Sequence, residues 1–367
     1  MAIAKRETLR LSDSRDVIEV SGSPRAQGLL HGRHAREGIV ANLAMARRWM
    51  DTVAARGRRY NYDAILSQNE QFIEGTAPEV LEEVRGIADG AGLPYRDVLA
   101  LNAPLYIVAT HLPLDCTQIL LGPPATRDGR TYMAKTRDLR GRLEHVVLHR
   151  RYDDGRETAE VNAAGTVTWP GSGMNNDGVA FGTSGCWSAR TVVDIDRAAD
   201  GWLLVNGHLP LRDSRSLDEF AERLSAQHRV TPINVVAGDA RGGATLEVTT
   251  DRVYRTPAVD GVAILTNHFV TPEISRLGPT PEEHPSSHGR YETARTQIRA
   301  HRGEWTGAAL LDLLGNHAGA PQGSICRHSQ HGVGADTVYA SIATVPDGEF
   351  WTTLDHPCRA QAGGGAR

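Results

Sequence analysis

The sequence predicts an α+β fold in which β-sheets and helices are layered in a sandwich. Three observations lead to this expectation. The chain is mainly helical in pattern up to about residue 109, strand-rich after Cys116, and interrupted there by two further helical segments. Strands grouped on both sides of helices, in mixed order, are typical of a layered α+β sandwich. The sequence shows no internal repeat and no separating linker, so one domain is expected.

The helical pattern of the first part rests on helix-boundary residues and apolar periodicity. Residues 34–56 are rich in Ala and Arg, and Thr76-Ala-Pro-Glu79 reads as a capping box that opens another helix. Pro78 is harmless early in a helix, because the N–H that it lacks would have no helical partner there. Gly90 or Gly92 ends this helix. Its apolar positions recur at helical spacing, at Val80, Leu81, Val84, Ile87 and Ala88.

The strand-rich part opens with a predicted antiparallel hairpin. Two β-prone runs flank a turn, residues 122–130, that contains Pro-Pro and Asp-Gly. If Leu121 lies opposite Thr131, the pairing places Cys116 opposite Thr136.

This pairing makes Cys116 a candidate nucleophile, because Arg137 and Asp138 would lie beside its thiol. A thiol with a pKa of about 8.5 is mostly protonated at neutral pH and needs a base. An α-amino group, with a pKa of about 7.7–8.0, suits that task. Cleavage of the chain before Cys116 would place both groups on one residue, which suggests a self-processed N-terminal nucleophile.

The remaining elements follow from turn and capping signals. One helix opens with the capping box Ser216-Leu-Asp-Glu219, and another covers about 287–300. Strands return at 337–345 and 349–354, and the glycine-rich segment 359–367 predicts a flexible tail. Turn signals between the strands are Asp128-Gly129, Asp154-Gly155, Asn176-Asp177-Gly178, Arg241-Gly-Gly243 and Asp260-Gly261.

Composition and charge exclude several classes of function. The chain has 367 residues, of which 40% are hydrophobic and 23% charged, as in ordinary globular proteins. A net charge of −4 and an aromatic content of 5% argue against nucleic-acid binding. No stretch approaches the roughly 18 apolar residues of a membrane span, and charges near the N-terminus precede any signal-peptide core. We therefore expect a cytoplasmic protein without nucleic-acid or membrane partners.

The cysteine and histidine patterns do not predict a metal site or disulfides. The four cysteines, Cys116, Cys186, Cys326 and Cys358, are far apart in the sequence and lack metal-ligand spacing. Free thiols are expected, and packing is the ordinary role of all but Cys116. For Cys116 the hairpin alone leaves packing and catalysis evenly balanced. No His-Glu-x-x-His pattern occurs among the 15 histidines, so no metal is expected.

Motifs from about residue 17 to 358 occur in the order of one known family. Asp115-Cys116-Thr117 is similar to a self-processing site, and Ala134-Lys-Thr-Arg-Asp138 corresponds to a Gly-Gln-Asn-x-Asp strand. Further matches lie at 20–32, which ends in His31-Gly32, and at 83–91, 98–102, 173–180, 265–269 and 324–328. Together they resemble the isopenicillin-N acyltransferase-like (acyl-CoA:6-aminopenicillanic acid acyltransferase) family of N-terminal-nucleophile (Ntn) cysteine hydrolases.

The resemblance implies a four-layer αββα Ntn-hydrolase sandwich that is made as a zymogen and cleaves itself before Cys116. The thiol of Cys116 would attack the carbonyl of Asp115, and water would open the resulting thioester. Residues 1–115 would become a mainly helical α-chain and residues 116–367 a catalytic β-chain. The two chains would stay associated as a heterodimer.

The resemblance also implies roles for individual residues. Asp138 would orient the amine or the substrate, Asn267 would donate to the tetrahedral oxyanion, and Arg327 would hold a carboxylate or support the nucleophile electrostatically. Substrate contacts are implied for Arg137, Thr136, His268 and Phe269. The sequence departs from the family at Asp115, where Gly is common, and at Thr136-Arg137, which replace Asn and an aromatic residue. The substrate is therefore not taken from penicillin chemistry.

These assignments predict a non-metal amidohydrolase or acyltransferase that acts through an acyl-cysteine. Its substrate would be a small N-acylated or peptide-like amide, or a thioester, in natural-product biosynthesis. No cofactor is expected, with acyl-CoA as an optional co-substrate. Two alternatives stay open: an amidase that deblocks a β-aminoacyl or peptidyl conjugate, and an unprocessed, catalytically silent binding protein.

Overall fold

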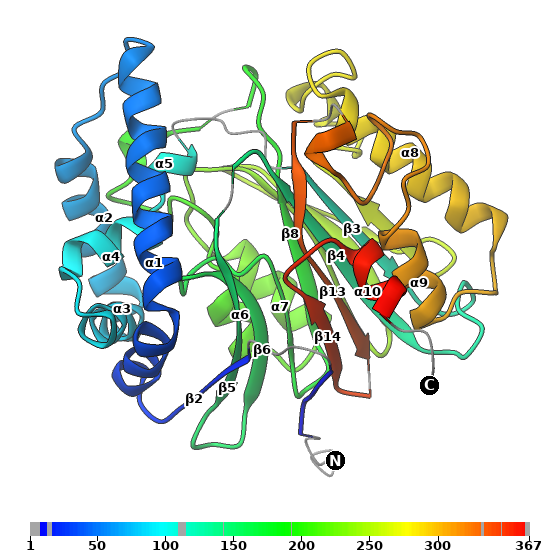
Figure 1. The fold of residues 1–367 in the computed structure, drawn as a ribbon, viewed down its shortest axis with the longest axis horizontal. Helices are drawn as coiled ribbons and strands as arrows, with labels where there is room; N and C mark the ends of the chain where they lie inside the picture. The colour runs from blue at the N-terminus through cyan, green and yellow to red at the C-terminus, as the bar shows by residue number, and fades with distance from the viewer. Residues whose placement is uncertain are drawn as a thin grey trace.

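The computed structural model describes residues 8–12, 17–108, 115–141, 143–191, 193–331, 334–345 and 347–363. They form two sheets that pack face to face and carry helices on their outer sides (Figure 1). The first sheet contains, in spatial order, β1 (Arg10–Ser12), β14 (Glu349–Thr353), β13 (Asp336–Val345), β4 (Thr131–Leu139), β3 (Asp115–Leu121) and β12 (Val262–Leu265). The second contains β11 (Val253–Pro257), β10 (Gly242–Val248), β9 (Ile233–Asp239), β8 (Ala180–Gly185), β7 (Ser172–Asn175), β6 (Glu157–Ala163), β5 (His145–Arg151) and β2 (Val17–Ser21).

Helices form the outer two layers, so the predicted αββα sandwich is confirmed (Figure 1). The second sheet is covered by α1 (Pro24–Ala55), α2 (Tyr62–Thr76), α3 (Pro78–Ala91), α4 (Tyr95–Asn102) and α5 (Leu105–Val108), and by α6 (His208–Asp213) and α7 (Leu217–Ser225). The first sheet is covered by α8 (Pro285–Ala300) and α9 (Gly307–Leu314). Helix α10 (Pro357–Gly363) and the 3₁₀ turns Ile195–Arg197, Ser275–Leu277 and Ser329–His331 complete the elements.

The N-terminal part of the chain contributes one strand to each sheet. Strand β1 pairs in parallel with β14, and β2 pairs in parallel with β5. Both strands lie at an edge of their sheet. The two predicted segments, 1–115 and 116–367, therefore share both sheets, and their division stays a prediction.

Helices α1 and α3 approach each other closely through glycines. A Cβ added at Gly28 or Gly32 would lie 2.0 or 2.2 Å from a backbone oxygen of α3, so only glycine fits. His31 is fully buried, and its Nε2 accepts a hydrogen bond from the N–H of Gly165 at 3.1 Å. Burial lowers the pKa of His31 to about 3, so the ring is neutral. The His31-Gly32 motif therefore has a packing role.

The two predicted capping boxes have different outcomes. Ser216 caps α7 by accepting a hydrogen bond from the N–H of Glu219 at 3.2 Å, which confirms that prediction. The box at Thr76 is wrong, because α2 continues through Thr76 and leaves it without the extended backbone of an N-cap. Ala77 takes the N-cap position of α3 without a side-chain bond, and Gly92 ends that helix with a φ of +63°.

The predicted hairpin of β3 and β4 is present, but its register differs by one residue. Leu121 pairs with Tyr132, and Cys116 therefore pairs with Arg137 instead of Thr136. The apolar pattern explains the shift, because directly paired residues share one face of a sheet. In the observed register Leu121 and Tyr132 both pack toward α8 and α9, in one apolar cluster.

Helix α10 overlaps the predicted flexible tail 359–367, of which residues 364–367 lie outside the described residues. The flexibility of this segment stays a prediction. Among the helices described, none carries an apolar run long enough to span a bilayer.

Candidate functional site

Cys116 lies near the beginning of β3, on the face that is turned toward the second sheet. Its alternating neighbour Leu120 packs in the cluster between the sheets, which fixes this direction. Arg137 is its cross-strand partner on β4, and Tyr339 pairs with Arg137 from β13. The exposed fraction of Cys116 is 0% in the intact chain. The thiol is therefore closed off from solvent in the intact chain.

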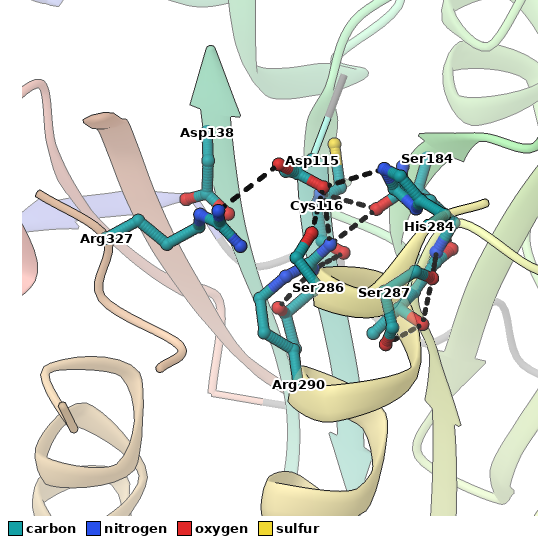
Figure 2. A network of polar contacts seen from close by, with 12 residues as sticks. Asp115, Cys116, Asp138, Ser184, His284, Ser286, Ser287, Arg290 and Arg327 are labelled. Carbon is teal, nitrogen blue, oxygen red and sulfur yellow. Dashed lines mark hydrogen bonds and ion pairs between the residues drawn. The ribbon is translucent and has the colours of Figure 1, made fainter. Parts of the chain in front are cut away.

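The peptide groups on both sides of Cys116 are held by polar side chains (Figure 2). The N–H of Cys116 donates to Asn267 Oδ1 at 2.8 Å, and Arg290 donates to the carbonyl oxygen of Cys116. Arg290 also donates to Asn267 Oδ1 at 2.9 Å. Asn267 in turn donates to the Gly185 carbonyl at 2.9 Å and, through its backbone N–H, to Ser287 Oγ at 2.8 Å. The nitrogen of the predicted scissile bond is thus fixed in place.

Asp115 points its carboxylate into a cationic pocket on the opposite face of β3 (Figure 2). Its Oδ1 accepts hydrogen bonds from Arg290 Nη2 at 2.9 Å and from Ser286 Oγ at 2.7 Å. His284 Nε2 lies 3.0 Å from the same oxygen, and Arg327 Nη2 lies 3.7 Å from Oδ2. Burial opposes ionisation of Asp115, but Arg290, His284 and Arg327 outweigh it and hold its pKa well below the usual range.

Asp138 lies opposite Asp115 on β4, and both side chains are on the helix-facing side of the sheet. Its Oδ1 accepts a hydrogen bond from Thr337 Oγ1 at 2.6 Å, while Oδ2 has no partner among the described residues. Burial raises the pKa of Asp138 to about 6, although Arg290 and Arg327 favour the carboxylate. The carboxyl group therefore changes its charge within the working range of many enzymes.

Arg327 is held close to Asp138 through its backbone. The N–H of Arg327 donates to Thr337 Oγ1 at 2.8 Å, and its carbonyl accepts from the Thr337 N–H at 3.0 Å. The same threonine hydroxyl donates to Asp138. The structure thus brings together all four predicted catalytic residues, with Asp138 and Arg327 on one side of the sheet and the Cys116 thiol on the other.

The four predicted substrate-binding residues lie in different surroundings. The Arg137 guanidinium lies 5.6 Å from the ring centroid of Trp169, and Thr136 is buried on the helix-facing side. His268 Nδ1 lies 2.8 Å from Ser287 Oγ, so it supports the hydroxyl that holds Asn267. Phe269 packs in an apolar cluster with Cys186 and Ile274. Substrate contact by these four residues stays a prediction.

Lys135 is a site residue that the sequence analysis did not single out. It is fully buried on the same face of β4 as Arg137, and its ammonium group donates to the Thr183 carbonyl. Burial lowers the pKa of Lys135 to about 8, although the nearby charge of a Cys116 thiolate favours the protonated amine. An amine with this pKa, beside a thiol, is suited to accept a proton. The only sign of it in the sequence is that position 135 holds a lysine, where the corresponding family motif Gly-Gln-Asn-x-Asp has a glutamine.

Arg290 was also missed, together with His284 and Ser286. A signal for it exists in the sequence, because Arg290, Ala294 and Ile298 follow one another at a spacing of four and share the buried face of α8. A charged residue on an apolar helix face indicates a buried partner. That partner, Asp115, lies far away in the sequence, so it cannot be inferred from periodicity.

A cleft of about 1030 Å³ opens beside the first sheet, at the same end of that sheet as Cys116. Leu139, which follows Asp138, and Thr337 line it, together with the part of α1 around Arg36. Cys116 is not among its lining residues. We therefore place the candidate site at the network around Cys116 and regard the cleft as its neighbour.

Two of the cysteines, which are far apart in the sequence, lie close together in the fold. Cys326 and Cys358 both approach His328, at 3.5 and 3.4 Å between sulfur and Nε2. Helix α10, which carries Cys358, packs against α9 and so lies near the segment that carries Cys326. Spacing in the sequence cannot reveal a long-range contact of this kind.

Comparison with known proteins yields one family and a set of distant structures. Residues 125–359 match the family described as acyl-coenzyme A:6-aminopenicillanic acid acyl-transferase, so the match begins after Cys116 and includes Asp138, Asn267 and Arg327. No curated protein matches the sequence. A variant of conjugated bile acid hydrolase from Clostridium perfringens is 12% identical with a TM-score of 0.41, over 65% of this chain and 89% of that one. Penicillin V acylase from Agrobacterium tumefaciens is 13% identical with a TM-score of 0.38, over 62% and 79%.

Proposed function

The chain belongs to the acyl-coenzyme A:6-aminopenicillanic acid acyl-transferase family, and from this premise we propose that it is a self-cleaving enzyme with Cys116 as nucleophile. It cuts the bond between Asp115 and Cys116 and then transfers or hydrolyses acyl groups at amides of small substrates. The proposal is carried by the surroundings of Cys116. Buried side chains fix both of its peptide groups, and the amine of Lys135 lies beside its thiol.

Self-cleavage is proposed to begin with attack of the Cys116 sulfur on the carbonyl carbon of Asp115. The C–N bond breaks, the nitrogen of Cys116 leaves as an amine with a proton, and a thioester remains between the two residues. Water then opens the thioester and frees the thiol and the Asp115 carboxyl group. Asn267 Oδ1, which accepts from the Cys116 N–H in the intact chain, would hold the new amine.

Lys135 is proposed as the base of the cleavage step, because the α-amine of Cys116 is still part of a peptide bond at that stage. Replacing Lys135 by Met is expected to slow self-cleavage on the order of 10²-fold, at the lower end of what general bases contribute. The rate is measured by following the intact chain on denaturing gels after synthesis in a cell-free system. The Lys135→Arg variant keeps the positive charge but is too weak a base, so it should be slow as well. Normal cleavage of Lys135→Arg would rule out a proton-transfer role.

Turnover is proposed to use the α-amine of Cys116 as the base. The thiol takes the acyl group from an amide or thioester, and the acyl-cysteine passes it to water or to an amine. The pocket that holds the Asp115 carboxylate in the intact chain supports a preference for substrates with a carboxylate, because Arg290, Arg327 and His284 all lie around that group. We infer that the substrate is an N-acyl amino acid or a peptide-like acid.

The pKa of Asp138 predicts an acid limb in the activity profile. A carboxylate at Asp138 is present above a pH of about 6 and is lost as the pH falls through this value. We expect kcat/KM for a chromogenic N-acyl-p-nitroanilide to fall about tenfold per unit below pH 6, if the carboxylate orients amine or substrate. The Thr337→Val variant loses the hydroxyl that lowers this pKa, so its acid limb should move to higher pH. An unchanged limb in that variant would assign it to another group.

The function is tested by the intact mass of the purified wild-type protein under denaturing conditions. Two fragments, residues 1–115 and 116–367, are expected, with Cys116 as the first residue of the larger one. Incubation with N-acyl amino acids and with their methyl esters then tests the substrate class, and the free acids should react faster. An uncut chain that also fails to react with thiol-directed substrate analogues would favour the silent binding protein.

A further inference from the structure

Three segments of the C-terminal part converge at one group of sulfur and nitrogen ligands. His317 follows α9, Cys326 and His328 lie in the segment before the 3₁₀ turn Ser329–His331, and Cys358 lies in α10. One ligand atom from each of these four side chains lies within 4.8 Å of every other. Cys326 is buried, His328 and Cys358 are half-buried, and His317 is exposed.

The distances within this group match those of a tetrahedral metal site. His328 Nε2 lies 3.5 Å from Cys326 Sγ and 3.4 Å from Cys358 Sγ. In a tetrahedron with Zn–S of about 2.3 Å and Zn–N of about 2.0–2.1 Å, the edge between nitrogen and sulfur is about 3.5 Å. A single imidazole lone pair can accept only one strong hydrogen bond from two thiols, whereas a metal ion between them satisfies all three groups.

We propose that His317, Cys326, His328 and Cys358 bind one Zn²⁺ ion. Two thiolates and two imidazoles form the Cys₂His₂ set of structural zinc sites, and four protein ligands leave no position for a substrate. The thiols lose their protons when the ion binds, so two protons are released and no electron is transferred. The proposal does not depend on the acyl-transfer function.

A second group of ligands beside this site is less suited to a metal. It consists of Asp336, His356 and the shared His328. The Asp336 carboxylate already accepts from the Ser329 N–H at 2.9 Å, and His356 Nε2 lies 3.4 Å from the same oxygen. The His356 ring stacks on His328 at 4.0 Å between centroids. These residues therefore support His328 from the side and hold its ring in place.

The proposed ion would act as a positioning element for the candidate active site. Arg327 lies between the two ligands Cys326 and His328 in the sequence. Its backbone N–H donates to the Thr337 hydroxyl, and its carbonyl accepts from the Thr337 N–H. Thr337 donates to Asp138, and the Arg327 guanidinium lies 3.7 Å from Asp115. Fixing residues 326–328 from α10 would thus hold Arg327 against the site without contact between zinc and substrate.

The test is the metal content of the full chain purified under reducing conditions. One zinc per chain is expected by elemental mass spectrometry after gel filtration. Co²⁺ added to the zinc-free protein should give the absorption of a tetrahedral thiolate complex. Removal of zinc by a chelator is expected to lower Tm by on the order of 5–10 °C.

Variants assign the ion to these ligands. His317→Gln changes an exposed residue and should fold, and Cys358→Ser removes one thiolate. Mutation of a residue that only supports a metal ligand typically weakens metal affinity 10-fold to 100-fold. Both substitutions remove a direct ligand, so each is expected to weaken zinc affinity by at least this factor. Cys186→Ala, a buried thiol in a different cluster, should retain one zinc per chain. Zinc-free wild-type protein with a Co²⁺ spectrum no different from buffer would overturn the proposal. A mass two hydrogens lower, from a disulfide between Cys326 and Cys358, would overturn it as well.

Discussion

Replacing Cys116 by alanine is expected to leave the chain as a single polypeptide of 367 residues without measurable acyl-transfer activity. Both proposed reactions need the same sulfur, first to attack the Asp115 carbonyl and then to carry the acyl group. No other described cysteine lies in the network of Asn267 and Arg290 that fixes the peptide groups of Cys116. The loss should therefore be complete for both, beyond the effect of a misplaced residue.

The measurement is the intact mass together with the release of amine from an N-acyl substrate. Cys186→Ala is the matched control, because Cys186 is just as buried but its side chain packs with Phe269 and Ile274 and makes no hydrogen bond to Cys116, Asn267 or Arg290 in the described residues. It should be cleaved and active. Cleavage of the Cys116→Ala chain at the same bond would show that another nucleophile, or an external protease, makes the cut.

Replacing Arg290 by methionine is expected to lower the free energy of unfolding by about 3–5 kcal/mol, the range for breaking a buried ion pair. Arg290 is fully buried and donates to four groups: the Asp115 carboxylate, the carbonyl of Cys116, the Thr117 hydroxyl and Asn267 Oδ1. Without it, a carboxylate that is held in its charged form loses its closest cation. Such a loss exceeds the effect of most single substitutions.

Urea unfolding measures this effect in a Cys116→Ala background, so that both proteins compared are uncut chains. The control is Arg295→Met on the same helix, because Arg295 pairs with Glu292 at 2.6 Å while both side chains are substantially exposed. Exposed pairs of this kind contribute up to about 0.5 kcal/mol. Equal midpoints for the two variants would mean that the buried network contributes little to stability.

Local patterns predicted the elements of the fold well, and the errors have a common physical origin. The capping box at Ser216 is correct because its bonds lie within four residues, whereas Thr76 was misread because the preceding helix continues through it. The hairpin was predicted, but its register depended on α8 and α9, which pack against Leu121 and Tyr132 from distant parts of the chain. Contacts of this kind leave no trace in a single sequence.

The same distinction applies to the candidate site. Cys116, Asp138, Asn267 and Arg327 were found through ordered motifs, and the structure brings them together. Arg290 and Lys135 were missed because burial gives them their properties, and burial is a result of the fold. The group around Cys326 and Cys358 was missed for a related reason. Its ligands meet only because α10, which carries Cys358, packs near the segment that follows α9.

The two edge strands of the N-terminal part, β1 and β2, have a consequence for the cut protein. Each is paired in parallel with a strand from beyond Cys116, so the proposed fragments 1–115 and 116–367 would be interleaved in both sheets. Unfolding of the cut protein would then release two separate polypeptides, and its midpoint should rise with protein concentration. The uncut chain would unfold in a concentration-independent reaction. Refolding after cleavage would become a second-order process, because the two fragments must first find each other. The cut protein would therefore refold more slowly at low concentration than the uncut chain.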